Sequence, residues 1–183
     1  MAVEATHPLR EVARARFRAS TEIPADFFEA NAARIALACR DLARAFHAGH
    51  RLLVLGEGAQ WSDAVHVSVE FVHPVIVGKR ALPALALQGD GLAQLRAIGE
   101  PGDFVLGLAT GGSEPVRAAV DAARRMGLQT ITLVGQVGSD WPGDHVFAVP
   151  SDDPFVVQEV HETLYHVLWE LVHVFLDHPG MLK

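Results

Sequence analysis

The chain has 183 residues, of which 50% are hydrophobic and 20% are charged. This length is enough for one domain with its own core, and this composition excludes a disordered, collagen-like or disulfide-built chain. The net charge of −7 argues against a nucleic-acid partner, and the single cysteine, Cys39, excludes an internal disulfide and a CxxC zinc site. No apolar run approaches the ~18 residues of a membrane span, and the first residues lack the apolar stretch of a signal peptide, so we expect a cytoplasmic protein without membrane contact.

The first 50 residues are expected to be helical. A short basic helix is predicted from about Pro8 to Ser20, and a longer one from Pro24 to the glycine at position 49. Proline is well tolerated in the first turn of a helix, and apolar residues recur at helical spacing after it. The sequence therefore predicts two separate helices in this segment.

The rest of the chain alternates apolar runs with helical patterns. The expected strands are 51–55, 84–87, 104–108, 130–134 and 145–149. The expected helices begin at Ser62 or Asp63, at Glu114 and at Pro154, whereas the segment 88–99 is short and weakly patterned. Strands that alternate with helices predict an α/β fold, an open parallel five-stranded sheet with helices on both faces.

Two glycine-rich loops separate a strand from a helix. They read Gly56-Glu57-Gly58-Ala59-Gln60 and Ala109-Thr110-Gly111-Gly112-Ser113. Ligands of such folds bind at the carboxyl ends of the strands, and the free N–H groups of a helix N-terminus favour an anion. The alternative is that the glycines only make tight turns. Neither loop has the dinucleotide-binding or P-loop pattern.

Polar residues interrupt two largely apolar helical segments. His66 and Glu70 are four residues apart in the first, and Gln158, Glu162 and His166 follow the same spacing in the last. Residues with this spacing share one face of a helix, so two such helices together would build a metal site or an acid–base pair. The alternative is a surface ion pair and a solvated helix face. The histidines at 47, 50, 145, 173 and 178 are interpreted as surface residues.

The whole chain resembles the sugar isomerase (SIS) domain proteins of the phosphoheptose isomerase type. The most specific segments are Asp63-Ala-Val-His66-Val-Ser-Val-Glu70 and Gln158-Glu-Val-His-Glu-Thr-Leu-Tyr-His166. The resemblance implies a single flavodoxin-like domain over residues 1–183. It also implies a zinc or other divalent metal site made by His66, Glu70, Gln158 and His166, with Glu70 as catalytic base and His166 as catalytic acid.

The same resemblance assigns the substrate to the two loops. It implies that a sugar phosphate is bound by Gly58, Ala59, Gln60, Thr110, Gly111, Gly112, Ser113 and Gln158. It further implies a homo-oligomer, a dimer or tetramer, packed in part through the helical segment 1–50.

The loops nevertheless depart from the family pattern. The first loop lacks the family's serine and carries the acid Glu57, the second keeps only Thr110 and Ser113 as hydroxyls, and the segment 88–100 is too short for the family's insertion. We therefore expect an aldose–ketose isomerase of a sugar phosphate. The alternatives are an isomerase of a different or unphosphorylated substrate and a non-catalytic module that binds a sugar phosphate or a protein partner for assembly or regulation.

Overall fold

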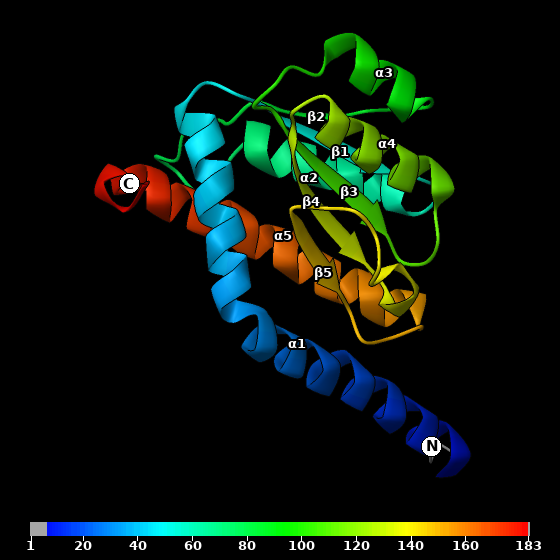
Figure 1. Ribbon diagram of the computed structural model, residues 1–183. Helices are drawn as coiled ribbons and strands as arrows, with labels where there is room; N and C mark the ends of the chain where they lie inside the picture. The colour runs from blue at the N-terminus through cyan, green and yellow to red at the C-terminus, as the bar shows by residue number, and fades with distance from the viewer. Residues whose placement is uncertain (1–6, 183) are drawn as a thin grey trace.

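A computed structural model describes residues 7–182 of the chain, and five parallel strands form its centre (Figure 1). The strands lie in the order β2-β1-β3-β4-β5. Their bounds are β1 Leu52–Gly56, β2 Ala84–Ala86, β3 Phe104–Ala109, β4 Gln129–Val134 and β5 His145–Ala148. The predicted open parallel sheet is confirmed, and no predicted strand end differs from the observed one by more than a residue.

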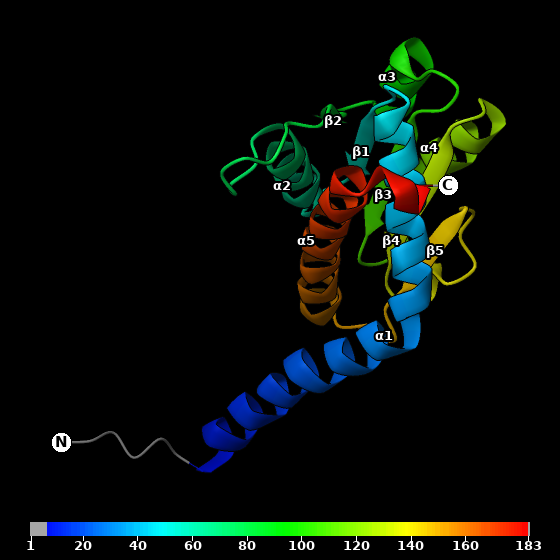
Figure 2. The ribbon, with the colours of Figure 1, turned by 90° about the vertical axis from the view of Figure 1, so that its left-hand side faces the viewer.

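Helices cover both faces of this sheet (Figure 2). Their bounds are α1 His7–His47, α2 Gln60–Val72, α3 Gly91–Ile98, α4 Glu114–Arg125 and α5 Pro154–Asp177, with short 3₁₀ turns η1 Gln136–Gly138 and η2 Pro179–Leu182. Because successive side chains of a strand point to opposite faces, Leu52 and Val54 join the core under α1, α2 and α5, whereas Leu53 and Leu55 join the core under α3 and α4. None of the helices within residues 7–182 combines the length and the apolar character that crossing a bilayer requires.

The N-terminal segment forms one helix rather than the two that the sequence predicts. Pro24 lies inside α1, which runs without a break and changes direction in its first half (Figure 1). Proline removes one backbone donor, and the Thr21 hydroxyl donates to the carbonyl of Phe17 at 2.9 Å, a contact that also bends helices. The helix continues through the bend, and its first half still contacts α5, because the Arg16 guanidinium pairs with Asp153 and Glu159 at 2.8 Å each.

Two other expectations about helices are corrected. The helix after the first loop begins at Gln60, not at a cap formed by Ser62 or Asp63, because the Ser62 hydroxyl donates backward to the Ala59 carbonyl and Asp63 is buried. The weakly patterned segment 88–99 contains α3, which Asp90 caps by accepting a hydrogen bond from the Ala93 amide at 2.9 Å. The cap stabilises a helix that is too short for its periodicity to be recognised.

The only cysteine is expected to be inert in the folded protein. Cys39 lies on α1 with none of its surface exposed, and burial raises the pKa of its thiol to about 12. Since the thiolate is the reactive form, a thiol reagent at pH 8 should modify the folded protein only as fast as it unfolds. Labelling followed by mass spectrometry, with and without denaturant, checks this expectation. Rapid modification of the folded protein would contradict it.

Candidate active site

The two glycine-rich loops lie where the sequence places them, at the carboxyl ends of β1 and β3. In the first loop Gly58 has a φ of +61°, a conformation that favours glycine, and the turn leads through Ala59 into Gln60 at the start of α2. In the second loop Thr110, Gly111 and Gly112 lead to Ser113, whose side chain caps α4 by accepting from the Val116 amide at 3.5 Å. Both predicted substrate-binding segments therefore face the same edge of the sheet.

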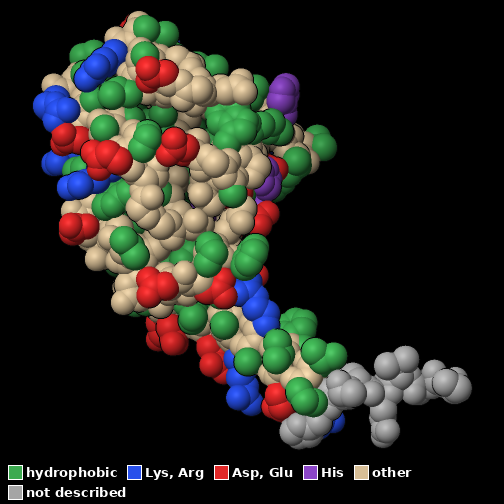
Figure 3. Space-filling view, turned by 90° about the vertical axis from the view of Figure 1, so that its right-hand side faces the viewer, with side chains coloured by type: hydrophobic (Ala, Val, Ile, Leu, Met, Phe, Trp, Pro, Cys, Tyr) green, Lys and Arg blue, Asp and Glu red, His purple; other side chains and the backbone are tan. Residues whose placement is uncertain are grey.

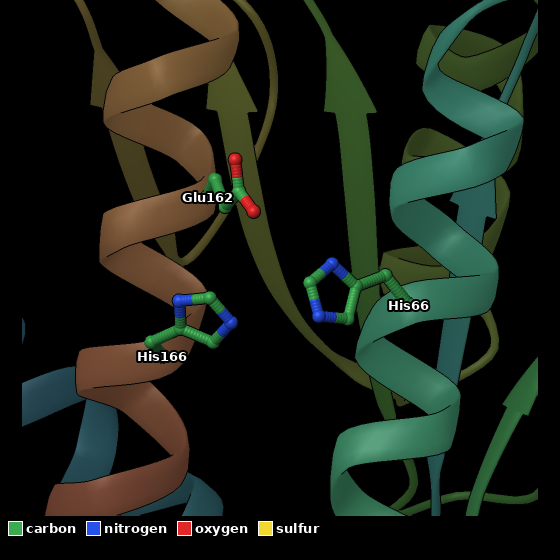
Figure 4. Close-up of side chains that lie close together, drawn as sticks. All are labelled: His66, Glu162 and His166. Carbon is green, nitrogen blue, oxygen red and sulfur yellow. The ribbon is translucent and has the colours of Figure 1, made fainter.

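Side chains of α2 and α5 meet beside the sheet. His66 of α2 faces Glu162 and His166 of α5 (Figure 4), and a ligand atom from each of the three lies within 4.8 Å of the others. The two imidazole rings are 5.2 Å apart between their centroids. Two imidazole nitrogens and a carboxylate oxygen at this spacing form a donor set suited to a divalent metal such as zinc.

The ring of His66 is oriented by contacts at both of its nitrogens. The Tyr165 hydroxyl lies 2.9 Å from Nδ1, and a carboxylate oxygen of Glu70 lies 3.4 Å from Nε2. Tyr165 is buried, and its pKa is raised, first by that burial and then by the nearby carboxylates. The hydroxyl therefore stays protonated at neutral pH, and Nε2 is the nitrogen that remains for either Glu70 or a metal.

Gln158, which the resemblance assigns to metal and substrate, is held by its amide nitrogen. Its Nε2 donates to both oxygens of Asp63, each at 3.1 Å. Burial raises the pKa of Asp63, and the hydrogen bond from Gln158 opposes that rise. Because a carboxylate only accepts hydrogen bonds, this contact fixes the orientation of the amide. The carbonyl oxygen of Gln158 is then the atom that remains to bind a metal or to accept a hydrogen bond from a substrate.

The structure thus treats the predicted ligands differently. It brings His66 and His166 together and places Glu70 next to His66, whereas Gln158 contacts Asp63 one turn before Glu162 on α5. The sequence places Glu162 on one helix face with Gln158 and His166, and its four-residue spacing to His166 is the signal that points to a ligand role. The Tyr165 contact had no sequence signal, because it joins residues 99 positions apart.

Buried histidines lie elsewhere on α5. His173, predicted at the surface, is 1% exposed, and its ring nitrogens lie within hydrogen-bond distance of the Trp169 and Arg80 carbonyls. His161 is fully buried, and among residues 7–182 only the Val134 backbone lies close to a ring nitrogen, without the geometry of a good hydrogen bond. Burial lowers the pKa of His161 to about 4, an effect that the Val134 backbone only partly offsets, so this ring is neutral at physiological pH.

Removing the Tyr165 hydroxyl should weaken metal binding. In Tyr165→Phe the His66 ring loses the partner of Nδ1 and samples more orientations, so we expect any affinity of the cluster for a divalent metal, measured with zinc, to fall roughly 10-fold or more. Competition with a chelator measures the affinity, and denaturant unfolding shows whether the fold is retained. An unchanged zinc affinity in a folded variant would mean that packing alone fixes the ring.

The chain was compared with family models, with known sequences and with solved structures. No family model matches the chain. The chain is 32% identical over 190 residues to the phosphoheptose isomerase of Thermodesulfovibrio yellowstonii, covering 93% of this chain and 94% of the relative. It is 36% identical over 170 residues to that of Solidesulfovibrio magneticus, covering 83% of each. The fold matches the structure of the Neisseria gonorrhoeae phosphoheptose isomerase with a TM-score of 0.79 at 23% identity, covering 90% of this chain and 98% of that one.

Proposed function

Because the chain belongs to the phosphoheptose isomerase family, we propose that it interconverts an aldose and a ketose, acting on a sugar phosphate or a related carbohydrate. The observation that carries the proposal is the meeting of His66 with Glu162 and His166 between α2 and α5. This cluster lies beside a sheet whose carboxyl edge carries the two glycine-rich loops. Such a site can hold the open-chain form of a sugar, and its side chains can transfer protons between neighbouring atoms of that sugar.

The proposed chemistry is a proton transfer between neighbouring carbons. Glu70 takes the proton from the carbon next to the carbonyl and returns it to the former carbonyl carbon. His166 moves the second proton between the two oxygens, so that no proton is gained or lost overall. Glu70 suits this role because its side chain is 17% exposed and lies 3.4 Å from the ring of His66, a member of the cluster.

The donor set fits a zinc ion, and His66, Glu162 and His166 would hold it. Three protein ligands leave positions open for substrate oxygens, as in catalytic rather than structural zinc sites. When bound, the metal polarises the sugar carbonyl as a Lewis acid. Since Tyr165 contacts Nδ1 of His66, the remaining Nε2 serves either Glu70 or the metal.

We also propose that the protein is a homo-oligomer, a dimer or tetramer. The first half of α1 carries three large apolar side chains that are at least 66% exposed, Leu9, Val12 and Phe17. Figure 3 shows hydrophobic side chains on the surface of this projecting part of the molecule. Burying them against a second copy would remove this surface from water. Sedimentation measurements of the mass test this proposal.

Residues 1–6 of the predicted N-terminal segment lie outside the described residues. The cytoplasmic location stays a prediction.

The proposed function is tested with metal-loaded protein. Sedoheptulose 7-phosphate and unphosphorylated sedoheptulose are each incubated at high enzyme concentration, and the aldose product is measured for wild type and His166→Ala. We expect turnover by the wild type that the variant lacks, together with metal in protein purified without chelator. No turnover of either sugar with zinc or manganese would overturn the proposal and favour a non-catalytic module.

A further inference from the structure

The carboxylate of Glu57 connects the two loops at the carboxyl edge of the sheet. Glu57 lies in the first loop, and its Oε2 accepts a hydrogen bond of 2.8 Å from the Ser113 hydroxyl of the second loop. The same hydroxyl caps α4 by accepting from the Val116 amide. The chain therefore places an anion of its own against the one serine hydroxyl of the second loop.

A cavity opens on the side of Glu57 that faces α3 and the first turn of α4, and Ser113 is not part of its wall. Its wall includes Glu57 and Asp90, together with apolar side chains of Leu55, Leu87 and Val116. No lysine or arginine is among the described residues that line it. A negatively charged and otherwise apolar wall is a poor environment for a phosphate dianion, because like charges held close together are strongly unfavourable.

Carboxylates of the chain already lie at the N-terminus of α4, where the helix carries a partial positive charge. Glu114 occupies its first turn, and Glu57 contacts its cap. The partial positive charge of a helix N-terminus attracts an anion, but here two carboxylates of the chain supply it. A substrate phosphate at this place would have to displace Glu57 from Ser113 and remain close to its charge.

We infer that Glu57 is a specificity-determining residue that selects a sugar ending in a neutral hydroxyl group over one ending in a phosphate. A sugar hydroxyl can replace Ser113 as the donor to the Glu57 carboxylate, whereas a phosphate dianion has no such donor to offer. This inference rests on the proposed function, which it narrows to unphosphorylated polyhydroxy sugars.

Substitutions at position 57 test the inference in the metal-loaded protein. The value of kcat/KM is measured for sedoheptulose and for sedoheptulose 7-phosphate. We expect wild type to prefer the unphosphorylated sugar by roughly 10-fold or more. Glu57→Gln removes the charge and should shift the ratio toward the phosphate by a similar factor, whereas Glu57→Asp keeps the charge and should keep the preference. Glu114→Gln removes a charge from the same helix end without touching Ser113 and should change the ratio much less.

Binding separates this inference from the proposed function. Calorimetry with inorganic phosphate and with sedoheptulose 7-phosphate needs no turnover, and we expect Glu57→Gln to bind both more tightly than wild type does. If neither sugar is turned over but this difference is seen, the isomerase proposal fails and the role of Glu57 stands. A wild type that prefers the phosphorylated sugar, or that binds phosphate as tightly as Glu57→Gln does, would overturn the inference.

Discussion

Glu70→Gln should lower kcat of the metal-loaded protein by a factor of roughly 100 to 10,000, the range associated with loss of a positioned general base. The amide has nearly the shape of the carboxylate and can still contact Nε2 of His66, 3.4 Å away in the native pair, so the fold should be kept. What the substitution removes is the ability to accept a proton from carbon. The effect should therefore appear in single-turnover kinetics at saturating zinc, where binding and product release do not limit the rate.

Glu162→Gln is the matched control for this prediction. If Glu162 holds the metal and Glu70 moves the proton, Glu162→Gln should lose zinc affinity, while Glu70→Gln should keep its zinc content and lose turnover. Metal analysis of both purified variants, alongside their rates at saturating zinc, separates the two roles. Loss of zinc from Glu70→Gln, with zinc retained in Glu162→Gln, would instead support the set His66, Glu70, Gln158 and His166 that the sequence resemblance implies.

The sheet could be predicted from sequence because its information is local. Each central strand is a short apolar run next to a turn, and the burial of β3 along its whole length matches that reading. The end of a helix depends on more than the local pattern. Pro24 is expected to begin a helix, but α1 bends there and continues. Its first half is held by Arg16, which pairs with Asp153 and Glu159, 137 and 143 positions away. The short α3 was missed because eight residues give too little periodicity.

The candidate site could be predicted only in part, for a related reason. Four-residue spacing places His66 with Glu70 and Glu162 with His166 on single helix faces, which sequence reasoning can find. Which of these side chains meet across the gap between α2 and α5 depends on how the helices pack. The contact of Gln158 with Asp63 joins residues 95 positions apart, and packing alone decides it. The ligand set is therefore harder to predict than the pair of helices that carries it.

We expect Asp103→Ala to lower the free energy of unfolding by about 3 kcal/mol without affecting the candidate active site. Asp103 is 1% exposed and lies just before β3. Its carboxylate accepts hydrogen bonds from the Arg51 guanidinium at 2.7 Å and from the backbone amides of Arg51 at 2.9 Å and Glu100 at 3.2 Å. Alanine leaves two backbone donors without this acceptor, at about 1–3 kcal/mol each when buried. Urea unfolding of the metal-free protein measures the change.

The position of Asp103 makes this prediction specific. Arg51 and Asp103 precede β1 and β3, so they join the amino ends of two neighbouring strands, whereas the glycine-rich loops follow the carboxyl ends of the same strands. Asp103→Ala should therefore keep its zinc affinity at temperatures where it is folded. Arg51→Ala should cost less, because the arginine side chain is 30% exposed and its removal leaves the backbone amides bonded to Asp103. Equal losses from the two substitutions would show that the ion pair, and not the acceptance of backbone N–H groups, is the stabilising contact at this end of the sheet.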